Sequence, residues 1–315
     1  MIKNNNVNFF QVAQGVWGMK LMFVNVFMIA NRRGVRKGWV LVDTGPQGSA
    51  NKIIAMAETL FGPGARPSAI ILTHGHSDHS GSLEELLKHW KVPVYAHEYE
   101  LPYLTGKSSY PPADPTVGGG VMSLFSVFFR KKPLKLGNKV KAIDMAESRI
   151  PELPEWRIIA TPGHSPGHIS LFFPLNTTLI VGDAFTTTKA ESAIYVLNYI
   201  KKLSGPPMYL TTDWKSAKSS VIKLAALHPR IAVTGHGPIM RGRELQVALD
   251  NLAENFDELA MPSSGRYVKQ RAVADETGVL YVPPFKANTK FVAATIITGL
   301  VAGFIIARQI HKSVA

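Results

Sequence analysis

Cysteine is absent from the 315 residues of this chain. The chain therefore forms no disulfide bond and offers no thiolate to a metal ion. Its stability has to come from an ordinary apolar core, and any metal ion has to be held by histidine nitrogen and carboxylate oxygen. Hydrophobic residues make up 46% of the sequence, which is enough for a globular domain with an additional apolar segment.

Acidic residues are few compared with basic ones: 22 Asp and Glu stand against 35 Lys and Arg, which gives a net charge of +13. An excess of this size favours an anionic partner, either nucleic acid or an acidic membrane surface. The densest basic clusters, at 31–37 and 130–132, are short and lack the interleaved aromatic residues of a single-strand binding surface. We therefore expect a membrane surface rather than nucleic acid as the partner.

Metal-binding side chains are concentrated directly after the apolar run 69–72. Four candidate ligands occupy six positions: His74, His76, Asp78 and His79. The first two histidines are two residues apart, so in extended backbone both side chains face one side and can share an ion. Asp78 and His79 follow where a helix is expected to start, so they point toward a second ion. A histidine-rich surface loop is the alternative, but four ligands at a strand end argue against it.

Further short motifs place single polar residues at the ends of apolar runs. They are Asp43 in 41–45, His164 and His168 in 161–168, Asp183 in 181–184, and His236 in 234–237. Together with the pattern His-x-His-x-Asp-His, these motifs resemble, in order, the signature of the metallo-β-lactamase-fold hydrolases. The resemblance covers roughly residues 7–260, and five motifs in the same order make it specific.

This resemblance implies an α/β fold, the four-layer αββα sandwich, with two divalent metal ions at one edge of its two sheets. It implies zinc, with iron or manganese as alternatives. The implied ligands are His74, His76 and His164 for one ion, Asp78, His79 and His236 for the other, and Asp183 as the bridge between both. Asp43 and His168 are expected to contact ligands rather than metal.

The resemblance also implies a reaction. Two adjacent ions lower the pKa of a bridging water, and one of them polarises the scissile carbonyl. Asp78 is the expected catalytic residue, which orients this hydroxide and passes its proton to the leaving group. The expected substrate is a small molecule with an ester, thioester or lactone bond, as in the glyoxalase II and lactonase branches. However, residues 184–189 lack the basic glutathione-binding segment of glyoxalase II, and Thr186 stands where acyl-homoserine lactonases have tyrosine.

Three other functions stay open at this point. A phosphodiesterase or nuclease of the same fold is favoured by the net charge alone. A mononuclear iron oxygenase is compatible with the motifs because the ligands do not fix the metal. A non-enzymatic, membrane-tethered binding protein conflicts with the complete ligand set, since a degenerate site is expected to have lost at least one ligand.

Residues 104–132 interrupt the compact pattern. Their first half is rich in Gly, Ser and Pro, and an apolar helix is expected over 121–129 because its aromatic residues form i,i+4 pairs. We expect this insertion to be a lid over the metal site, in which Phe125, Phe128 and Phe129 contact an apolar acyl part of the substrate. Packing of these rings on the sandwich and contact with a membrane surface are the alternatives.

Hydrophobic periodicity elsewhere alternates between helices and strands, as in α/β proteins. Helices are expected over 51–61, 82–90, 209–227 and 241–260. Strands are expected over 21–30, 39–42, 69–72, 92–96, 138–144, 156–161, 168–173, 178–182 and 230–233. Asp213 is the expected N-cap of the helix within 209–227.

An uncharged apolar run of 17 residues occupies positions 291–307. As a helix it spans about 26 Å at about 1.5 Å per residue, close to the hydrocarbon core of about 30 Å. We expect a single transmembrane anchor, with a buried helix or an apolar oligomer contact as the alternative. The expected organisation is a catalytic domain at 1–265, a linker at 266–290, the anchor at 291–307 and a basic tail at 308–315.

Gly299 and Gly303 form a Gly-x-x-x-Gly pattern in this apolar run, which allows two such helices to pack closely. A homodimer is therefore a further expectation. The N-terminal half shows no secretory signal, because the apolar run 21–30 lies well inside the chain and lacks a small-residue cleavage site. We accordingly expect a single-pass membrane protein with a cytoplasmic catalytic domain.

Overall fold

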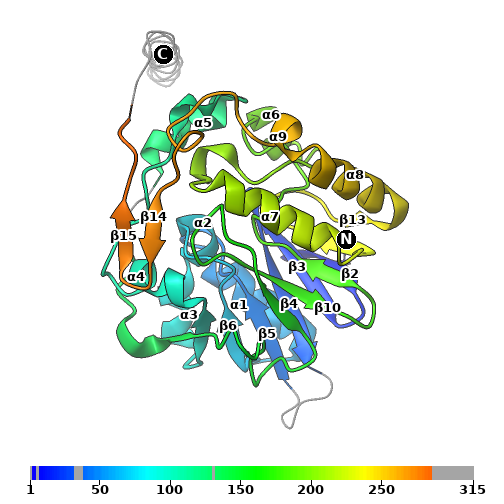
Figure 1. Ribbon diagram of the computed structural model, residues 1–315. Coiled ribbons are helices and arrows are strands. Elements are labelled where there is room, and N and C mark those ends of the chain that lie inside the picture. Colours follow the sequence, from blue (N-terminus) through cyan, green and yellow to red (C-terminus); the bar gives the residue numbers. More distant parts are fainter. Residues whose placement is uncertain (1, 5–6, 32–37, 130–131, 286–315) are drawn as a thin grey trace, which may run out of the picture.

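Two β-sheets form the centre of the molecule in the computed structural model, which describes residues 2–4, 7–31, 38–129 and 132–285 (Figure 1). The eight-stranded sheet keeps its strands in chain order: β1 (Ile2–Asn4), β2 (Val7–Ala13), β3 (Val16–Leu21), β4 (Val24–Asn31), β5 (Gly38–Val42), β6 (Ala69–Ile71), β7 (Val94–Ala96) and β8 (Val140–Ala142). The five-stranded sheet has the order β13 (Met240–Arg241), β12 (Ile231–Val233), β11 (Thr178–Ile180), β10 (Ile169–Phe173) and β9 (Arg157–Ala160).

Strands β1 to β5 of the first sheet are antiparallel, and β5 to β8 are parallel. In the second sheet the pair β11–β12 is parallel and its other pairs are antiparallel. Parallel strands end at the same edge of a sheet, so β5, β6 and β7 deliver the loops that follow them to one place.

Four long helices cover the outer faces of the two sheets. Helices α1 (Ala50–Phe61) and α3 (Leu83–His89) pack on the first sheet, and α7 (Trp214–Ala225) and α8 (Gly242–Glu254) pack on the second. The short helices are α2 (Ser77–Ser80), α4 (Leu101–Leu104), α5 (Val121–Phe125), α6 (Ala193–Leu197) and α9 (Phe256–Leu259). Single 3-10 turns are η1 (Glu98–Glu100), η2 (Pro115–Val117), η3 (Ser126–Phe128), η4 (Gly137–Lys139) and η5 (Met208–Leu210).

Three apolar cores separate these four layers. In β5, Leu41 packs toward α1 and α3, whereas Val40 and Val42 pack toward the second sheet, as the period of two residues requires. In the second sheet Ile180 faces the first sheet, and Leu179 faces α7 and α8. The αββα sandwich expected from the sequence is therefore the observed architecture.

Most predicted elements are confirmed within a few residues. Asp213 caps α7 as predicted, because its carboxylate accepts a hydrogen bond of 3.0 Å from Ser216 N. The predicted single strand 21–30 is wrong, since β3 ends at Leu21 and β4 begins at Val24. Met22 has φ of 58°, a left-handed conformation that reverses the chain between these two strands.

The segment after α9 packs against the sandwich. Tyr267 is buried in the core beneath α7 and α8, and β14 (Val273–Asp275) pairs with β15 (Gly278–Tyr281) in a hairpin. Val279 N donates to Ser108 Oγ at 3.2 Å, so this hairpin also contacts the insertion 104–132. Residues 266–285, which belong to the expected linker, thus carry regular structure and tertiary contacts.

The prediction of a transmembrane helix is corrected by the structure. Among the described residues, none of the helices is long and apolar enough to cross a membrane. The longest described helix, α8, has 13 residues, or about 20 Å at about 1.5 Å per residue, against about 30 Å of hydrocarbon. The run 291–307 itself lies outside the described residues. For the described part of the chain we therefore correct the predicted fold to the αββα sandwich alone, and we do not retain the single-pass membrane location.

Candidate metal centre

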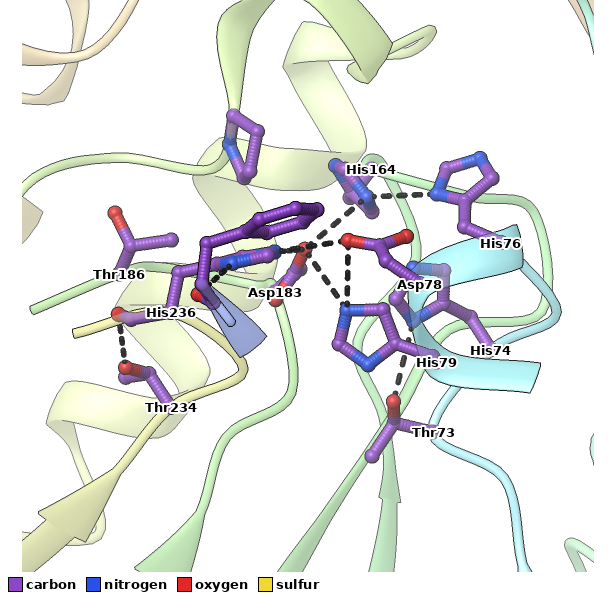
Figure 2. A network of polar contacts seen from close by, with 12 residues as sticks. Thr73, His74, His76, Asp78, His79, His164, Asp183, Thr186, Thr234 and His236 are labelled. Carbon is purple, nitrogen blue, oxygen red and sulfur yellow. Dashed lines mark hydrogen bonds and ion pairs between the residues drawn. The ribbon is translucent and has the colours of Figure 1, made fainter. Parts of the chain in front are cut away.

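The candidate ligands lie on loops that follow strands of both sheets. The loop after β6 leads into α2, and further loops follow β9, β11 and β12. Figure 2 shows that these loops turn seven side chains toward one another: His74, His76, Asp78, His79, His164, Asp183 and His236. Residues between positions 74 and 236 thus meet at the edge where the two sheets end.

A first group of ligands consists of His74, His76 and His164. Their ligand atoms lie within 4.8 Å of one another, and all three side chains are buried. His76 Nδ1 lies 3.0 Å from His164 Nε2 (Figure 2). The hydroxyl of Thr73 pairs with His74 Nδ1 at 3.1 Å, which leaves Nε2 of that ring for a metal ion.

A second group consists of Asp78, His79 and His236, whose ligand atoms are equally close together. Helix α2 carries the first two, and Asp78 Oδ2 lies 3.3 Å from His236 Nε2. His236 Nδ1 is held by the backbone carbonyl of Phe23 at 2.9 Å, and the two rings stack at 6.0 Å. The turn between β3 and β4 therefore fixes this imidazole with Nε2 toward the other ligands.

Asp183 lies between the two groups. Its Oδ2 is 3.1 Å from His236 Nε2, and 3.5 Å from both His79 Nε2 and His164 Nε2 (Figure 2). His74, His79 and Asp183 also form a close set of potential ligands. One carboxylate is thus within reach of imidazoles from both groups.

Unpaired buried atoms show that these residues fit a metal ion. His74 Nε2, His79 Nε2 and Asp183 Oδ1 are fully buried and have no hydrogen-bond partner within the described part of the chain. Leaving a buried polar atom unpaired costs about 1–3 kcal/mol, and three such atoms in one cluster are unusual. Imidazole and carboxylate are ligands of divalent ions, so the cluster is suited to hold them.

Asp43 lies behind the candidate ligands and supports both groups through hydrogen bonds. Its Oδ1 accepts from Thr73 N, and its Oδ2 accepts from Thr73 Oγ1 and pairs with His79 Nδ1, each at 2.8 Å. Asp43 has φ of 60°, a strained conformation that this network of contacts maintains. The carboxylate thereby orients His79 directly and His74 through Thr73.

His168 is not among the seven, although it shares a motif with His164. Its Nε2 accepts from Asp183 N at 2.8 Å, and its Nδ1 pairs with Thr161 Oγ1 at 2.8 Å. Burial lowers the pKa of His168 to about 3, so the ring is neutral. A Cβ at Gly182 would lie 2.5 Å from His168 Nε2, so glycine is required there. His168 therefore positions Asp183.

The first group is neutral at physiological pH. Burial lowers the pKa of His76 to about 4 and holds the pKa values of His74 and His164 well below the ordinary value. Neighbouring imidazoles lower the pKa values of His74 and His164 further. Neutral imidazole is the form that binds metal.

The second group carries opposite charges. Burial alone would lower the pKa of His79 and of His236, but the carboxylates of Asp183 and Asp78 outweigh it. They raise the pKa of His236 to about 10 and hold that of His79 well above its ordinary value. Burial would likewise raise the pKa values of the two carboxyl groups, but His79 and His236 hold them below their usual range.

An apolar cavity of about 240 Å³ opens beside the second group. Its lining includes Asp78, His236, His76, Met122, Phe128, Phe129, Val196, Tyr209 and Leu210. Of the three lid phenylalanines named from the sequence, Phe128 and Phe129 line this cavity. Phe125 is outside its lining and is 39% exposed.

A second cavity, of about 250 Å³, also borders α2, with Asp78, Tyr103, Tyr110 and Lys132 in its lining. Asp78 borders both cavities and is 21% exposed, whereas the other ligands are buried. A substrate in either cavity would therefore reach this carboxylate.

Sequence reasoning missed several residues that shape the site. Phe23 lies in a run interpreted as a strand, and Tyr209 at the start of a predicted helix, so neither carried a local signal. Both line the apolar cavity with Asp78 and His236. Aromatic residues without a motif acquire such a role through tertiary packing alone.

Comparison with known proteins agrees with this geometry. Residues 19–236 match the family model described as "Metallo-beta-lactamase superfamily". A Bacillus subtilis protein named "Probable metallo-hydrolase YflN" is 42% identical over 250 residues, which cover 79% of this chain and 94% of the relative. Another from the same organism, "Probable metallo-hydrolase YybB", is 34% identical over 151 residues, or 48% of this chain and 59% of the relative.

Among solved structures, BJP-1, a subclass B3 metallo-β-lactamase of Bradyrhizobium japonicum, is similar in fold. The TM-score is 0.53 at 21% sequence identity, and the match covers 79% of this chain and 92% of that one. At this identity the likeness concerns the fold and not the substrate.

Proposed function

Because this chain belongs to the metallo-β-lactamase superfamily, we propose that it is a metal-dependent hydrolase that cleaves an ester, thioester or lactone. The observation that carries the proposal is that two groups of metal ligands meet at Asp183 beside an apolar cavity. Within the superfamily we assign it to the glyoxalase II and lactonase type of hydrolase.

Each group of ligands would hold one divalent ion, and Asp183 would contact both. Such ions, when bound, polarise a carbonyl and lower the pKa of water. The donors suit zinc, and they also suit iron or manganese. His74, His76 and His164 bring no charge to the site, whereas Asp78 and Asp183 bring two negative charges that offset part of the charge of the ions.

Asp78 is the residue placed to move a proton. Its carboxyl group stays ionised because the neighbouring imidazoles hold its pKa below the usual range, and it borders both cavities. Its free oxygen can accept a proton from the attacking water and return it to the leaving group. His76 and His236 line the apolar cavity alone, and the other four ligands line neither of these two cavities.

The apolar cavity supports a carbonyl substrate with an apolar group. Its described lining residues include neither lysine nor arginine, so apart from the metal ions themselves the cavity offers no cation to a phosphodiester. Phe129 and the 79% exposed Phe128 supply aromatic surface to the lining that also contains Asp78 and His236. We assign to these two residues the contact with the acyl part, so that 104–132 acts as the wall of the substrate site.

Thr186 does not replace the tyrosine of the lactonases. Its hydroxyl is buried and donates to Thr188 O at 2.8 Å and to Gly205 O at 3.2 Å. Tyr209 lines the apolar cavity together with Asp78 and His236. Of the two hydroxyl-bearing side chains in this lining, Ser77 and Tyr209, we assign Tyr209 to the substrate carbonyl.

The proposal is tested with a panel of thioesters, lactones, carboxylic esters and phosphodiesters, each with a short and a long apolar group. We expect turnover of carbonyl substrates, and a loss of about 10²–10⁴-fold in kcat for Asp78→Asn. His89→Ala is the matched control, because His89 is exposed and outside the site. Cleavage of phosphodiesters alone would overturn the assigned substrate class.

A further inference from the structure

Glu100 is a buried carboxylate next to the metal centre. It ends η1, just after β7, and its side chain is fully buried. Four donors surround it: Gly75 N at 2.9 Å and the hydroxyl of Tyr110 at Oε2, and Ser165 Oγ at 2.7 Å and Gly167 N at 2.8 Å at Oε1. Burying a carboxylate is costly unless its oxygens are paired, and this arrangement satisfies both oxygens.

The two oxygens of Glu100 bind two different loops. Oε2 binds the loop after β6 at Gly75, which lies between His74 and His76. Oε1 binds the loop after β9 at Ser165 and Gly167, directly after His164. One side chain thus ties together the two loops that carry the first group of ligands. The hydrogen bond from Ile169 N to Thr73 O is a further link between these two segments.

Close packing around Glu100 depends on two glycines. A Cβ at Gly167 would lie 2.8 Å from Glu100 Cγ, and a Cβ at Gly75 would lie 2.6 Å from the hydroxyl of Tyr110. Both loops therefore approach the carboxylate as closely as backbone can.

Tyr110 extends this contact to the insertion 104–132. Its hydroxyl donates to Glu100 and accepts from Gly75 N at 2.8 Å, and its ring lies 4.4 Å from the ring of His76. The ring also stacks on Tyr103 at 3.9 Å and lines the second cavity. The insertion is thereby joined to a metal ligand.

We infer that Glu100 is a positioning residue that sets the distance between His76 and His164, and that Tyr110 transmits the same constraint from the insertion. The inference rests on the proposed function, because it assigns these residues to one of two ions. His74, His76 and His164 come from two loops, so the geometry of the first group depends on how those loops are tied.

Glutamine at position 100 tests this inference without a change in volume. A carboxylate accepts at both oxygens, but an amide presents one oxygen and one NH₂ group. Whichever way it is turned, the NH₂ group faces one backbone N–H, of Gly75 or of Gly167, from which it cannot accept, so Glu100→Gln loses the backbone bond to one loop. Glu98→Gln is the matched control, since Glu98 belongs to the same turn η1 but is exposed.

The experiment measures zinc binding by competition with a chelator, for the full-length protein and these two variants. His76→Ala and His236→Ala identify which affinity belongs to which group. The affinity of the first group is the one that His76→Ala abolishes. We expect Glu100→Gln to weaken this affinity by about 10–100-fold, the range for residues that orient metal ligands. The affinity of the second group, which is the one that His236→Ala abolishes, should stay at the wild-type level in Glu100→Gln. In Glu98→Gln both zinc affinities should stay at the wild-type level.

Two results would overturn the inference. One is equal zinc affinity in Glu100→Gln and wild type. The other is an equal loss at both groups together with a lower melting temperature of the metal-free variant, which shows a role in the fold alone. Failure of the wild-type protein to bind zinc at all would instead overturn the proposed function along with the inference.

Tyr110→Phe gives a second, milder test, because it keeps the ring against His76 and removes the hydroxyl. We expect about a five-fold weaker affinity at the first group, in line with the loss of the bond from this hydroxyl to Glu100, since Gly75 N keeps its bond to that carboxylate. An unchanged affinity in this variant would contradict the role of the insertion.

Discussion

The two groups of candidate ligands differ in charge and in the way they are held. The first group has three neutral imidazoles and is tied together by a buried carboxylate, Glu100. The second group pairs protonated imidazoles with carboxylates, and its His236 is held by backbone at Phe23. The first is preformed by the packing of loops, and the second is preformed by its own ion pairs.

Asn25 holds the second group as Glu100 holds the first. It is buried, its Nδ2 donates to Thr234 O at 3.0 Å and to Gly237 O at 2.8 Å, and its Oδ1 accepts from Tyr199 at 3.1 Å. These bonds fix the loop that carries His236. Each group of ligands therefore depends on a different buried polar residue that lies outside the motifs.

Replacement of the residue shared by both groups should have the largest effect. We expect Asp183→Ala to lose metal at both groups and to lower turnover by about 10³-fold or more, since several kcal/mol of metal-derived stabilisation disappear. Elemental analysis and kcat measure the two losses. Asp250→Ala, on the exposed face of α8, is the control. Retention of both ions in Asp183→Ala would show that the groups are independent.

Truncation of an aromatic side chain in the wall of the apolar cavity should have the second-largest effect, which is a change in substrate preference. We expect Phe129→Ala to lower kcat/KM for long-chain substrates relative to short ones by about 10–200-fold, the range for apolar pocket contacts. Phe125→Ala is the matched control, because Phe125 comes from the same segment but lies outside the cavity lining. Equal effects of the two variants would count against the assigned acyl site.

Removal of the Asn25 side chain should affect the second group selectively. We expect Asn25→Ala to weaken the zinc affinity assigned to that group by about 10–100-fold. We also expect it to lower the free energy of unfolding by about 1–3 kcal/mol, since buried carbonyls lose their donor. Chelator competition and thermal denaturation measure both changes, with the exposed Asn51→Ala as control. A larger loss at the first group would reverse the assignment.

The charge difference between the groups predicts proton release. The pKa of His236 is raised to about 10 in the metal-free protein, and that of His79 is held well above its ordinary value, so both rings are protonated at neutral pH. Metal binding requires neutral imidazole, so filling the second group should release about two protons per chain from these rings. The first group should release none. An indicator dye in weakly buffered solution measures this, and absence of release would contradict the assigned charges.

The helices and strands could be predicted because their signals are local, whereas the sandwich and the grouping of the seven candidate ligands came from the resemblance of the motifs to a known family. Strands and helices show their period within a few residues, and each ligand lies in a short motif at the end of an apolar run. The turn at Met22 was missed since its positive φ leaves no trace in a continuous apolar run.

Glu100 and Asn25 could not be predicted because their partners are far away in sequence. Glu100 contacts Ser165, 65 positions later, and Asn25 contacts Thr234, 209 positions later. A buried glutamate and a surface glutamate look alike in sequence, as Glu98 and Glu100 illustrate. The cavity likewise joins Phe23 to Tyr209 by tertiary packing.

The most direct test of the account is the metal content of the purified full-length protein, measured by elemental analysis without added metal. Two ligand groups that meet at Asp183 predict about two divalent ions per chain, falling toward one in His76→Ala and in His236→Ala. A single ion in the wild-type protein that persists in one of these variants, or no ion at all, would contradict it.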